Sequence, residues 1–115
     1  MQEEQAVSTD AVRAELKRIL ASAHFDASDR NRSFLSYVVE EALEGRTDRI
    51  KAYIIATEVF GRDPTFDPQV DSIVRIEAGR LRRSLERYYL TDGRVGRLRI
   101  DIPRGGLGAA TCWTY

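Results

Sequence analysis

The sequence contains one cysteine, one histidine and no apolar run near the roughly 18 residues that a membrane-spanning helix needs. Cys112 alone cannot form a disulfide within the chain, which agrees with a reducing compartment. The first residues, Met1 to Glu4, are acidic and lack the basic and then apolar layout of a secretory signal. We therefore expect a cytoplasmic protein. A length of 115 residues suits one domain and is short for two.

The chain also lacks the groups of residues that enzymes need. His24, the single histidine, follows an apolar helical pattern and precedes Phe25, so we expect it to pack or to cap. Cys112 has no base near it in the sequence and resembles a small hydrophobic residue. The run Gly105–Gly108 lacks the lysine and the helix that follow a phosphate-binding loop. We predict no enzymatic activity and no cofactor.

Three aspartates, Asp63, Asp67 and Asp71, have a spacing that suggests a calcium loop. However, Pro68 stands where such a loop requires glycine, and Val74 stands where it requires a bidentate glutamate. Because short acidic side chains accept hydrogen bonds from nearby backbone amides, we expect these aspartates to initiate turns and to cap the following helix. We expect no metal ion.

The formal net charge of zero hides an uneven distribution. Residues 1–70 carry 9 arginines and lysines against 13 acidic residues, whereas residues 71–115 carry 9 arginines against 5 acidic residues. All nine of the later arginines fall between Arg75 and Arg104. Polyanion binding depends on the local field, because phosphate contacts release counterions only where the cations lie. A solvated charged face would give the same distribution, so charge alone leaves both interpretations open.

Apolar residues at helical spacing predict four helices. Ser28 can cap the second helix, and the glycines Gly45 and Gly61 can end the second and the third. The expected helices run from Ser8, Thr9 or Asp10 to about Ala23, from Ser28 to Gly45, within Ala52–Phe60, and from Asp71 or Ser72 to about Leu90. Residues 1–9 are expected to be a flexible leader and residues 10–115 to form the domain.

After the fourth helix the pattern changes to strict alternation. Leu98, Ile100 and Ile102 alternate with charged residues, which indicates a half-buried strand. We expect a tight turn at residues 103–106 and a last strand around Leu107–Trp113. The expected fold class is α+β, with four helices followed by a C-terminal β-hairpin.

The fourth predicted helix has an apolar stripe and, away from it, a basic face. The stripe consists of Val74, Ala78, Leu81 and Leu85, and the opposite side holds Ser72, Arg75, Gly79, Arg82 and Arg83, with Arg80 and Arg87 flanking. An α-helix fits the major groove of B-DNA, and arginine binds both guanine edges and phosphates. Glycine inside a helix costs about 1 kcal/mol relative to alanine. Gly79 therefore indicates close approach of a base or phosphate, or packing against a neighbouring helix.

Two other segments could reach a nucleic acid. The short helix before the fourth one completes a helix-turn-helix, and its Lys51, Tyr53 and Thr57 could contact the DNA backbone or serve only solubility. Arg104 lies at the tip of the predicted hairpin beside two glycines. An arginine there suits a narrow minor groove, although it could equally be a solvated turn residue.

The basic helix and the strand after it resemble a known family. The runs Ser72–Leu85 and Leu98–Gly106 are similar to the C-terminal effector domain of OmpR/PhoB-type response regulators. That family has a recognition helix ending in R-L-R-[RK]-x-L and a hairpin ending in R-G-x-G-Y. The matching positions are Arg80, Leu81, Arg82, Arg83 and Leu85 in the helix and Arg104-Gly105 in the hairpin. The resemblance covers about residues 31–108 and implies a winged helix, with the fourth helix in the major groove and the wing near the minor groove.

A closer resemblance is to domains at the N-terminus of some larger bacterial proteins with adenylate-cyclase-like, tetratricopeptide or propeller parts. The shared residues are Phe34-Leu35-x-Tyr37-Val38-Val39, Ala56-x-x-Val59-Phe60-Gly61-Arg62, Phe66-Asp67-Pro68, Val74-Arg75 and Arg80-Leu81-Arg82. Two positions depart from the response-regulator pattern. Gly106-Leu107 replaces the glycine–tyrosine end of the wing, and Arg75 replaces an acidic residue near the helix start.

We therefore predict a sequence-specific double-stranded DNA-binding domain that regulates transcription, built as a winged helix-turn-helix with an extra N-terminal helix. The helix at 72–89 would enter the major groove, and the hairpin at 97–110 would be the wing. The predicted DNA-binding residues are Arg75, Gly79 and Arg82 at bases, Arg80, Arg83, Arg87 and Lys51 at phosphates, Arg104 in the minor groove, and Ser72 at the start of the helix.

The alternative is a protein-interaction module that keeps the winged-helix core without binding DNA. The apolar stripe within Val12–Ala23 could pack on the core, or it could pair with a second copy or with another protein. Because a lone winged helix has a small footprint, we expect a homodimer or tandem copies on DNA.

Overall fold

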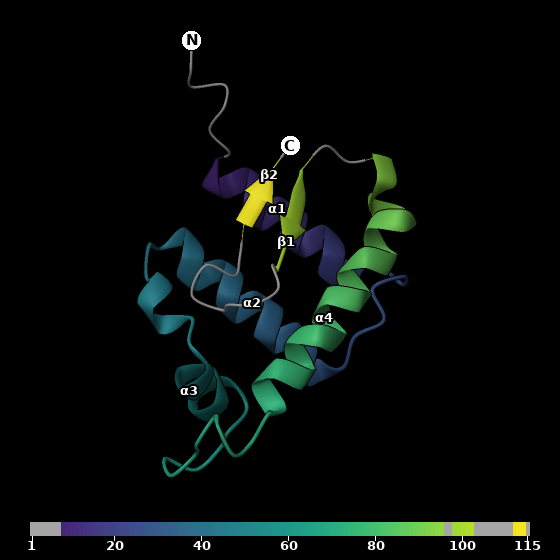
Figure 1. Ribbon diagram of the computed structural model, residues 1–115. Helices are drawn as coiled ribbons and strands as arrows, with labels where there is room; N and C mark the ends of the chain where they lie inside the picture. Colours follow the sequence, from purple (N-terminus) through teal and green to yellow (C-terminus); the bar gives the residue numbers. More distant parts are fainter. Residues whose placement is uncertain (1–7, 96–97, 103–111, 115) are drawn as a thin grey trace.

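The computed structural model describes residues 8–95, 98–102 and 112–114. Its helical elements are α1 (Thr9–Ala21), α2 (Asp29–Leu43), η2 (Thr47–Arg49), α3 (Ala52–Ile54), η3 (Ile55–Val59), α4 (Ile73–Leu90) and η4 (Asp92–Val95). Two short strands follow, β1 (Arg99–Asp101) and β2 (Cys112–Thr114). In Figure 1, α1 and the strands lie at one end of the molecule, α3 lies at the other, and α2 and α4 pass between them. The described residues form a compact, mostly helical fold.

The ends of α1 and α2 follow from local hydrogen bonding. The Ser8 hydroxyl accepts the amide of Ala11 at 3.0 Å, and the Ser28 hydroxyl accepts the amide of Asn31 at 3.1 Å, so both serines are N-caps as predicted. Gly45 has a φ of 78°, which an L-residue with a side chain rarely adopts, and it follows the end of α2. The helix α1 ends at Ala21, two residues before the expected position, because the backbone of Ser22 is extended.

The third predicted helix is only partly α-helical. The α-helical turn of α3 runs into η3, a π-helical segment in which the amide of Phe60 donates to the carbonyl of Ile55 at 3.1 Å. The wide turn buries Ile55 and brings the Phe60 ring edge-on to Phe34, with 5.4 Å between centroids. The prediction of a helix within Ala52–Phe60 is therefore confirmed, whereas its π-helical turn was not predicted, since periodicity alone does not distinguish the two kinds of turn.

The three aspartates between η3 and α4 stabilise turns, as predicted. Asp63 accepts the amide of Thr65 at 2.8 Å, and Asp67 accepts the amide of Gln69 at 2.9 Å. Asp71 accepts the amide of Ile73 at 3.0 Å and so satisfies a free amide at the start of α4. Each carboxylate thus has a local backbone partner. Among the residues that the structure describes, no group of three acidic, histidine or cysteine side chains could hold a metal ion.

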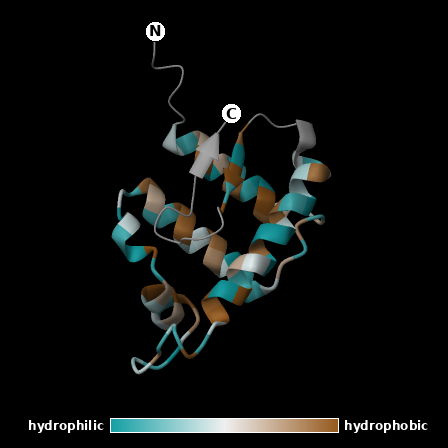
Figure 2. Cartoon of the chain, viewed as in Figure 1, coloured by the Kyte–Doolittle hydropathy of each residue, from teal (hydrophilic) through white to brown (hydrophobic). Residues whose placement is uncertain are grey.

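The apolar stripe of α1 packs on the core of the same chain. Val12, Leu16 and Ile19 are buried together with apolar residues of α2, α4 and β1. Figure 2 shows hydrophobic residues gathered where these elements meet. Of the two alternatives for this helix, the structure shows packing on the core. Within the described ranges, no helix has the length and apolar character needed to cross a bilayer.

The strand predicted from alternation is present, but it is short. Leu98, Ile100 and Ile102 are buried, whereas Arg99 is exposed, so the predicted faces of the strand are confirmed. β1 runs antiparallel to β2, with Ile100 opposite Trp113. β2, at Cys112–Thr114, overlaps the end of the strand expected around Leu107–Trp113, and the rest of that expected strand lies outside the described residues. The expected turn and the tip of the hairpin fall on residues 103–111, outside the described part of the chain.

A buried polar network joins α1, α4 and β1. The Tyr89 hydroxyl donates to Glu15 Oε2 at 2.7 Å and accepts the amide of Ile100 at 2.8 Å. Arg18 donates to the other oxygen of Glu15 at 2.8 Å. Burial, and then the hydrogen bond to Glu15, raise the pKa of Tyr89 above its ordinary value, so this hydroxyl keeps its proton. The network satisfies a carboxylate that would otherwise be costly to bury.

His24 does not pack in the core, so that part of the prediction was wrong. Its side chain is exposed, and its Nδ1 lies 2.9 Å from Asp92 Oδ1. The Ser22 hydroxyl donates to the other oxygen of Asp92. These contacts join the end of α1 to the start of η4. In a catalytic triad the histidine lies between the acid and the serine, whereas here the aspartate lies between them, so this group has the wrong order for nucleophilic catalysis.

Candidate nucleic-acid interface

The two faces of α4 divide as the sequence predicted. The stripe of Val74, Ala78, Leu81 and Leu85 is buried. On the other side Arg75, Arg80, Arg83 and Arg87 are exposed, while Ser72, Gly79 and Arg82 are partly buried. The helix therefore presents a basic surface outward and an apolar surface inward, because charged and apolar residues alternate with the period of the helix.

Three of the exposed arginines have no partner in the described parts of the chain. The side chains of Arg75, Arg83 and Arg87 make no salt bridge or hydrogen bond there. Arginine side chains elsewhere among the described residues are paired: for example, Arg13 binds Glu40 at 2.8 Å and Arg46 binds Glu41 at 2.7 Å. These three guanidinium groups form no ion pair in the described chain, and Glu86 is an acidic residue on the same side. The outward face of α4 thus keeps a net positive charge, which favours an attractive field toward an anion.

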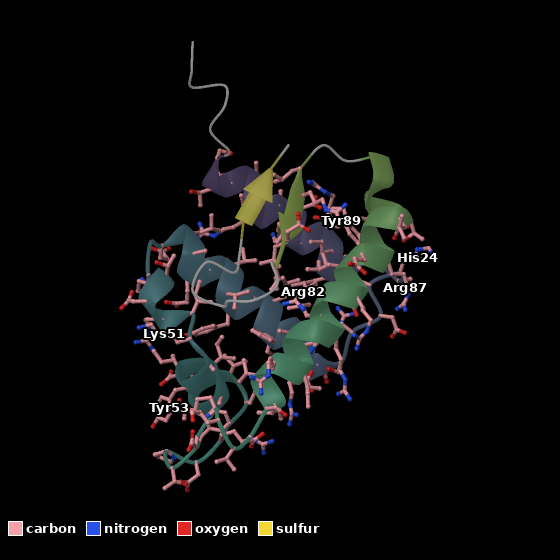
Figure 3. The ribbon with its side chains drawn as sticks, in the orientation of Figure 1. His24, Lys51, Tyr53, Arg82, Arg87 and Tyr89 are labelled. Atoms are coloured by element: carbon pink, nitrogen blue, oxygen red, sulfur yellow. The ribbon has the colours of Figure 1, made fainter. Side chains whose placement is uncertain are left out.

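Arg82 has a structural contact. Its Nε donates to the carbonyl of Ile102 at 2.7 Å, and the side chain lies on the side of α4 turned toward β1 (Figure 3). Arg87 lies on the other side of the helix in the same view. The contact from Arg82 fixes the segment after β1 against α4. The sequence analysis placed Arg82 at a base. To contact a base, Arg82 would have to break its hydrogen bond to the Ile102 carbonyl.

Gly79 is not explained by packing inside the chain. A Cβ placed on it would meet only Arg83 Nη1, at 3.7 Å, which is an ordinary contact, and no described atom of another helix lies within 4 Å. The predicted alternative of packing against a neighbouring helix therefore has no support among the described residues. Among the described residues, no packing contact compensates for the free-energy cost of a glycine inside α4.

A hollow lies between the arginine side of α4 and the start of α2. One wall consists of Arg80, Arg83 and Arg87 of α4, and the other is formed by Asp26, Ser28 and Asn31. The Ser84 hydroxyl donates to the Asp26 carbonyl at 2.9 Å and holds the two walls together. Three guanidinium groups beside the first amides of a helix give the hollow a chemistry suited to phosphate, although the Asp26 carboxylate at its edge opposes this.

Glu77 orients this region, and the sequence analysis missed it. Its buried carboxylate accepts Asn31 Nδ2 at 2.5 Å and Arg80 Nη1 at 3.2 Å, and it lies 3.8 Å from Arg30 Nη1. It thereby joins α4 to the first turn of α2 and holds two arginines. The available signal was its position, three residues after Val74 and thus on the apolar side of the helix.

Ile76 was also missed. It is 50% exposed and lies on the outward side of α4, off the apolar stripe. The signal in the sequence was an apolar residue at a helical position where charged neighbours predicted a polar one. An exposed branched aliphatic side chain in the middle of a basic helix face has no packing explanation in the described chain.

Three residues in the segment before α4 were predicted to contact the DNA backbone, and two of them make hydrogen bonds within the chain. The Tyr53 hydroxyl donates to the Pro64 carbonyl at 2.9 Å, and the Thr57 hydroxyl donates to the Tyr53 carbonyl at 3.0 Å. Lys51 is exposed, but it lies across the molecule from Arg87 in Figure 3. The structure therefore gathers Arg80, Arg83 and Arg87 at one hollow and leaves Lys51 apart from them. Arg104 lies outside the described residues.

Comparisons of the chain with family models, with curated proteins and with solved structures found no match. The geometry of α4 and its surroundings is consequently the basis on which a function is proposed.

Proposed function

We propose that this domain binds double-stranded DNA as a winged helix-turn-helix, with α4 in the major groove. The observation that carries the proposal is the outward face of α4, where Arg75, Arg83 and Arg87 are exposed and unpaired among the described residues. Retaining exposed, unpaired cations on one helix face brings no stability to the fold. It does supply the local field that a polyanion needs.

The arrangement of side chains across α4 supports insertion into a groove. The short or missing side chains of Ser72 and Gly79 lie near the centre of the outward face, and arginines lie on both sides of it. The major groove is about 12 Å wide and accepts one helix, so its centre can approach bases while its flanks reach the phosphates of both strands. Short side chains at the centre and arginines at the flanks suit that geometry, and Arg83, on the central line one turn beyond Gly79, reaches the hollow beside α2.

The hollow beside α2 supports a backbone contact on one flank. Arg83 and Arg87 can donate to a phosphate there, and the first turn of α2 adds amides and the positive end of its dipole. Arg80 is held at the hollow by Glu77. Phosphate contacts of this kind set the position of a protein on the duplex without reading its sequence.

The wing forms part of the same proposal. The antiparallel pairing of β1 with β2 supports a C-terminal hairpin, and the contact from Arg82 to Ile102 holds its first strand on α4. We propose that Arg104 at its tip enters the minor groove and that the domain acts in transcription as a dimer or in tandem copies.

A protein-interaction module is the less favoured function. It was suggested by the apolar stripe of α1, and that stripe is buried in the core of the same chain. An apolar interface would also leave the unpaired arginines of α4 unexplained.

The test is the salt dependence of DNA binding by the variants Arg75→Ala and Arg83→Ala, with Lys17→Ala on α1 as the control of equal charge change. Each arginine that contacts a phosphate contributes about one unit to the slope of log affinity against log salt concentration. We expect each arginine variant to bind more weakly, and the loss of a phosphate contact to lower this slope by about one, while Lys17→Ala matches the wild type. Arg82→Ala is avoided because it would also release Ile102.

Slopes and affinities equal to those of the wild type in both arginine variants would overturn the assignment of α4. Absence of binding to any duplex across a genomic library at low salt would overturn the proposed function itself.

A further inference from the structure

We propose that Ile76 contacts the C5 methyl group of a thymine in the major groove, so that the binding site of this domain contains a thymine at a fixed position. This inference rests on the proposed function and specifies which base the helix recognises.

The first support is the exposure of Ile76. Half of its surface is exposed, and the other strongly exposed aliphatic residues of the described chain lie elsewhere: Val70 (84%) in the turn before α4 and Leu90 (74%) at its last position. Leu90 shares that side of α4 but lies about 21 Å farther along the axis, so Ile76 is the exposed aliphatic residue among Arg75, Arg80 and Arg83. Leaving such a side chain in water costs free energy in the unbound domain, which a ligand that covers it would recover.

The second support is the line of residues to which Ile76 belongs. At about 100° per residue, Ser72, Ile76, Gly79 and Arg83 lie within an arc of about 60°, directly opposite the buried stripe. The first three of these residues would enter deepest into a groove, and Arg83 at the end of the line reaches the hollow beside α2. In order along the helix, these residues supply a hydroxyl, a branched apolar group, a position without a side chain and a guanidinium. A helix face exposed only to solvent would be expected to carry mainly charged and polar residues.

The third support is the gap at Gly79, one turn after Ile76. Nothing in the described chain fills the space in front of it apart from Arg83 Nη1. A base edge can therefore approach the backbone of α4 beside Ile76. Arg83 lies seven residues beyond Ile76, a rise of about 10 Å or about three base pairs.

The chemistry of the groove selects the ligand. Among the groups that base pairs present in the major groove, the methyl of thymine is the apolar one, and aliphatic side chains pack against it. A carbonyl oxygen, ring nitrogen or amino group of a base would lose hydrogen bonds to water against Ile76 without replacement. A thymine methyl is consequently the group that this position favours.

The experiment uses the whole chain and a duplex selected from a random pool by the wild-type protein. Each thymine of that duplex is replaced in turn by uracil, which removes the methyl and keeps the base pair. We expect one replacement to weaken wild-type binding about fourfold, the value for one buried methyl group. The same replacement should leave binding by Ile76→Ser unchanged. Leu90→Ser, which also removes an exposed aliphatic side chain from α4, should retain the full sensitivity.

Two results would overturn the inference even if the protein binds DNA. Either no thymine-to-uracil replacement weakens binding by the wild type, or the replacement weakens binding by Ile76→Ser as much as binding by the wild type. A protein that binds no duplex would overturn the inference together with the proposed function. Thermal unfolding of Ile76→Ser checks that the variant is folded, and the exposed position predicts no loss of stability.

Discussion

Gly79 is the residue of α4 for which the stability of the helix and the proposed DNA binding favour different side chains. It lies in the interior of the helix, where glycine is less favourable than alanine by about 1 kcal/mol. No described neighbour needs the space that its missing side chain leaves. Alanine at this position would therefore make the unbound domain more stable.

For Gly79→Ala we expect the free energy of unfolding to rise by about 1 kcal/mol, because the backbone of the unfolded chain loses freedom and the added methyl meets only an ordinary contact. DNA affinity should fall, because the methyl occupies the gap in front of a base edge. Urea denaturation and a binding titration on one preparation measure both quantities. A variant that gains stability and keeps its full affinity would show that the gap is not used.

At the residue scale, the sequence predicted the buried stripe of α4 and its exposed arginines, because burial follows the helical period, but it did not predict the burial of Glu77 or the exposure of Ile76. It did not predict what each side chain binds. Arg82 and Arg83 are adjacent in sequence and similar in chemistry, yet Arg82 donates to the Ile102 carbonyl and Arg83 has no described partner. That difference arises from the position of β1, which the sequence of the helix does not contain.

At the scale of elements, the buried network of Glu15, Tyr89 and the Ile100 amide joins three segments that are distant in sequence. The Tyr89 hydroxyl is hydrogen-bonded to both other groups, and all three residues are buried. Removing one hydroxyl would leave both a carboxylate oxygen and a backbone amide without that partner, and such losses cost more than an exposed hydrogen bond.

We expect Tyr89→Phe to lower the free energy of unfolding by about 1 to 3 kcal/mol, since the ring stays and the buried partners of its hydroxyl are left unsatisfied. Tyr53→Phe is the matched control, because it removes a hydroxyl whose hydrogen bond to Pro64 is exposed. Chemical denaturation compares the two. Equal effects of the two substitutions would contradict the importance of the network.

The elements themselves were predictable to different degrees. The bounds of α1, α2 and α4 followed from caps, glycines and apolar spacing, which act within a few residues. The π-helical segment η3 did not follow, because Phe60 packs on Phe34 through a contact made across the fold. The end of β2 falls within one residue of the end of the expected strand, whereas its pairing with β1 depends on the partner strand and could not be read from its own sequence.

For the whole molecule, the protonation of its carboxyl groups makes the free energy of unfolding depend on pH. The pKa of Glu41 is lowered by the hydrogen bond from Arg46, that of Asp63 by the amide of Thr65, and that of Asp92 by the Ser22 hydroxyl and then by His24. In each case the folded chain holds the proton less tightly than the unfolded chain. The stabilisation is thus complete above the ordinary pKa of about 4 and is lost as pH falls through the folded values.

We expect the free energy of unfolding to change little between pH 7 and pH 5 and to decrease from pH 5 toward pH 2. Urea denaturation at several pH values measures this. In Asp92→Asn the decrease should be smaller, because one of the contributing carboxyl groups is gone. A stability that is constant between pH 5 and pH 2, or equal pH profiles for both proteins, would refute this account.

How α1 joins the rest of the molecule could not be predicted. Its stripe of Val12, Leu16 and Ile19 suits any apolar partner, so the sequence allowed a second copy as readily as the core. The decision depends on where β1 and the end of α4 leave apolar surface uncovered, and on a buried glutamate that finds Tyr89 there. Both are properties of the assembled fold.

The π-helical segment η3 also affects how this chain should be compared with others. A π-turn accommodates one residue more than an α-turn, and one residue corresponds to a rotation of about 100° around a helix. A relative whose helix is regular here would carry the counterpart of Phe60 one position earlier. An alignment of the two sequences therefore needs a single-residue gap between Ile55 and Phe60. Without that gap, every residue from Phe60 to the start of α4 would be matched to the wrong neighbour.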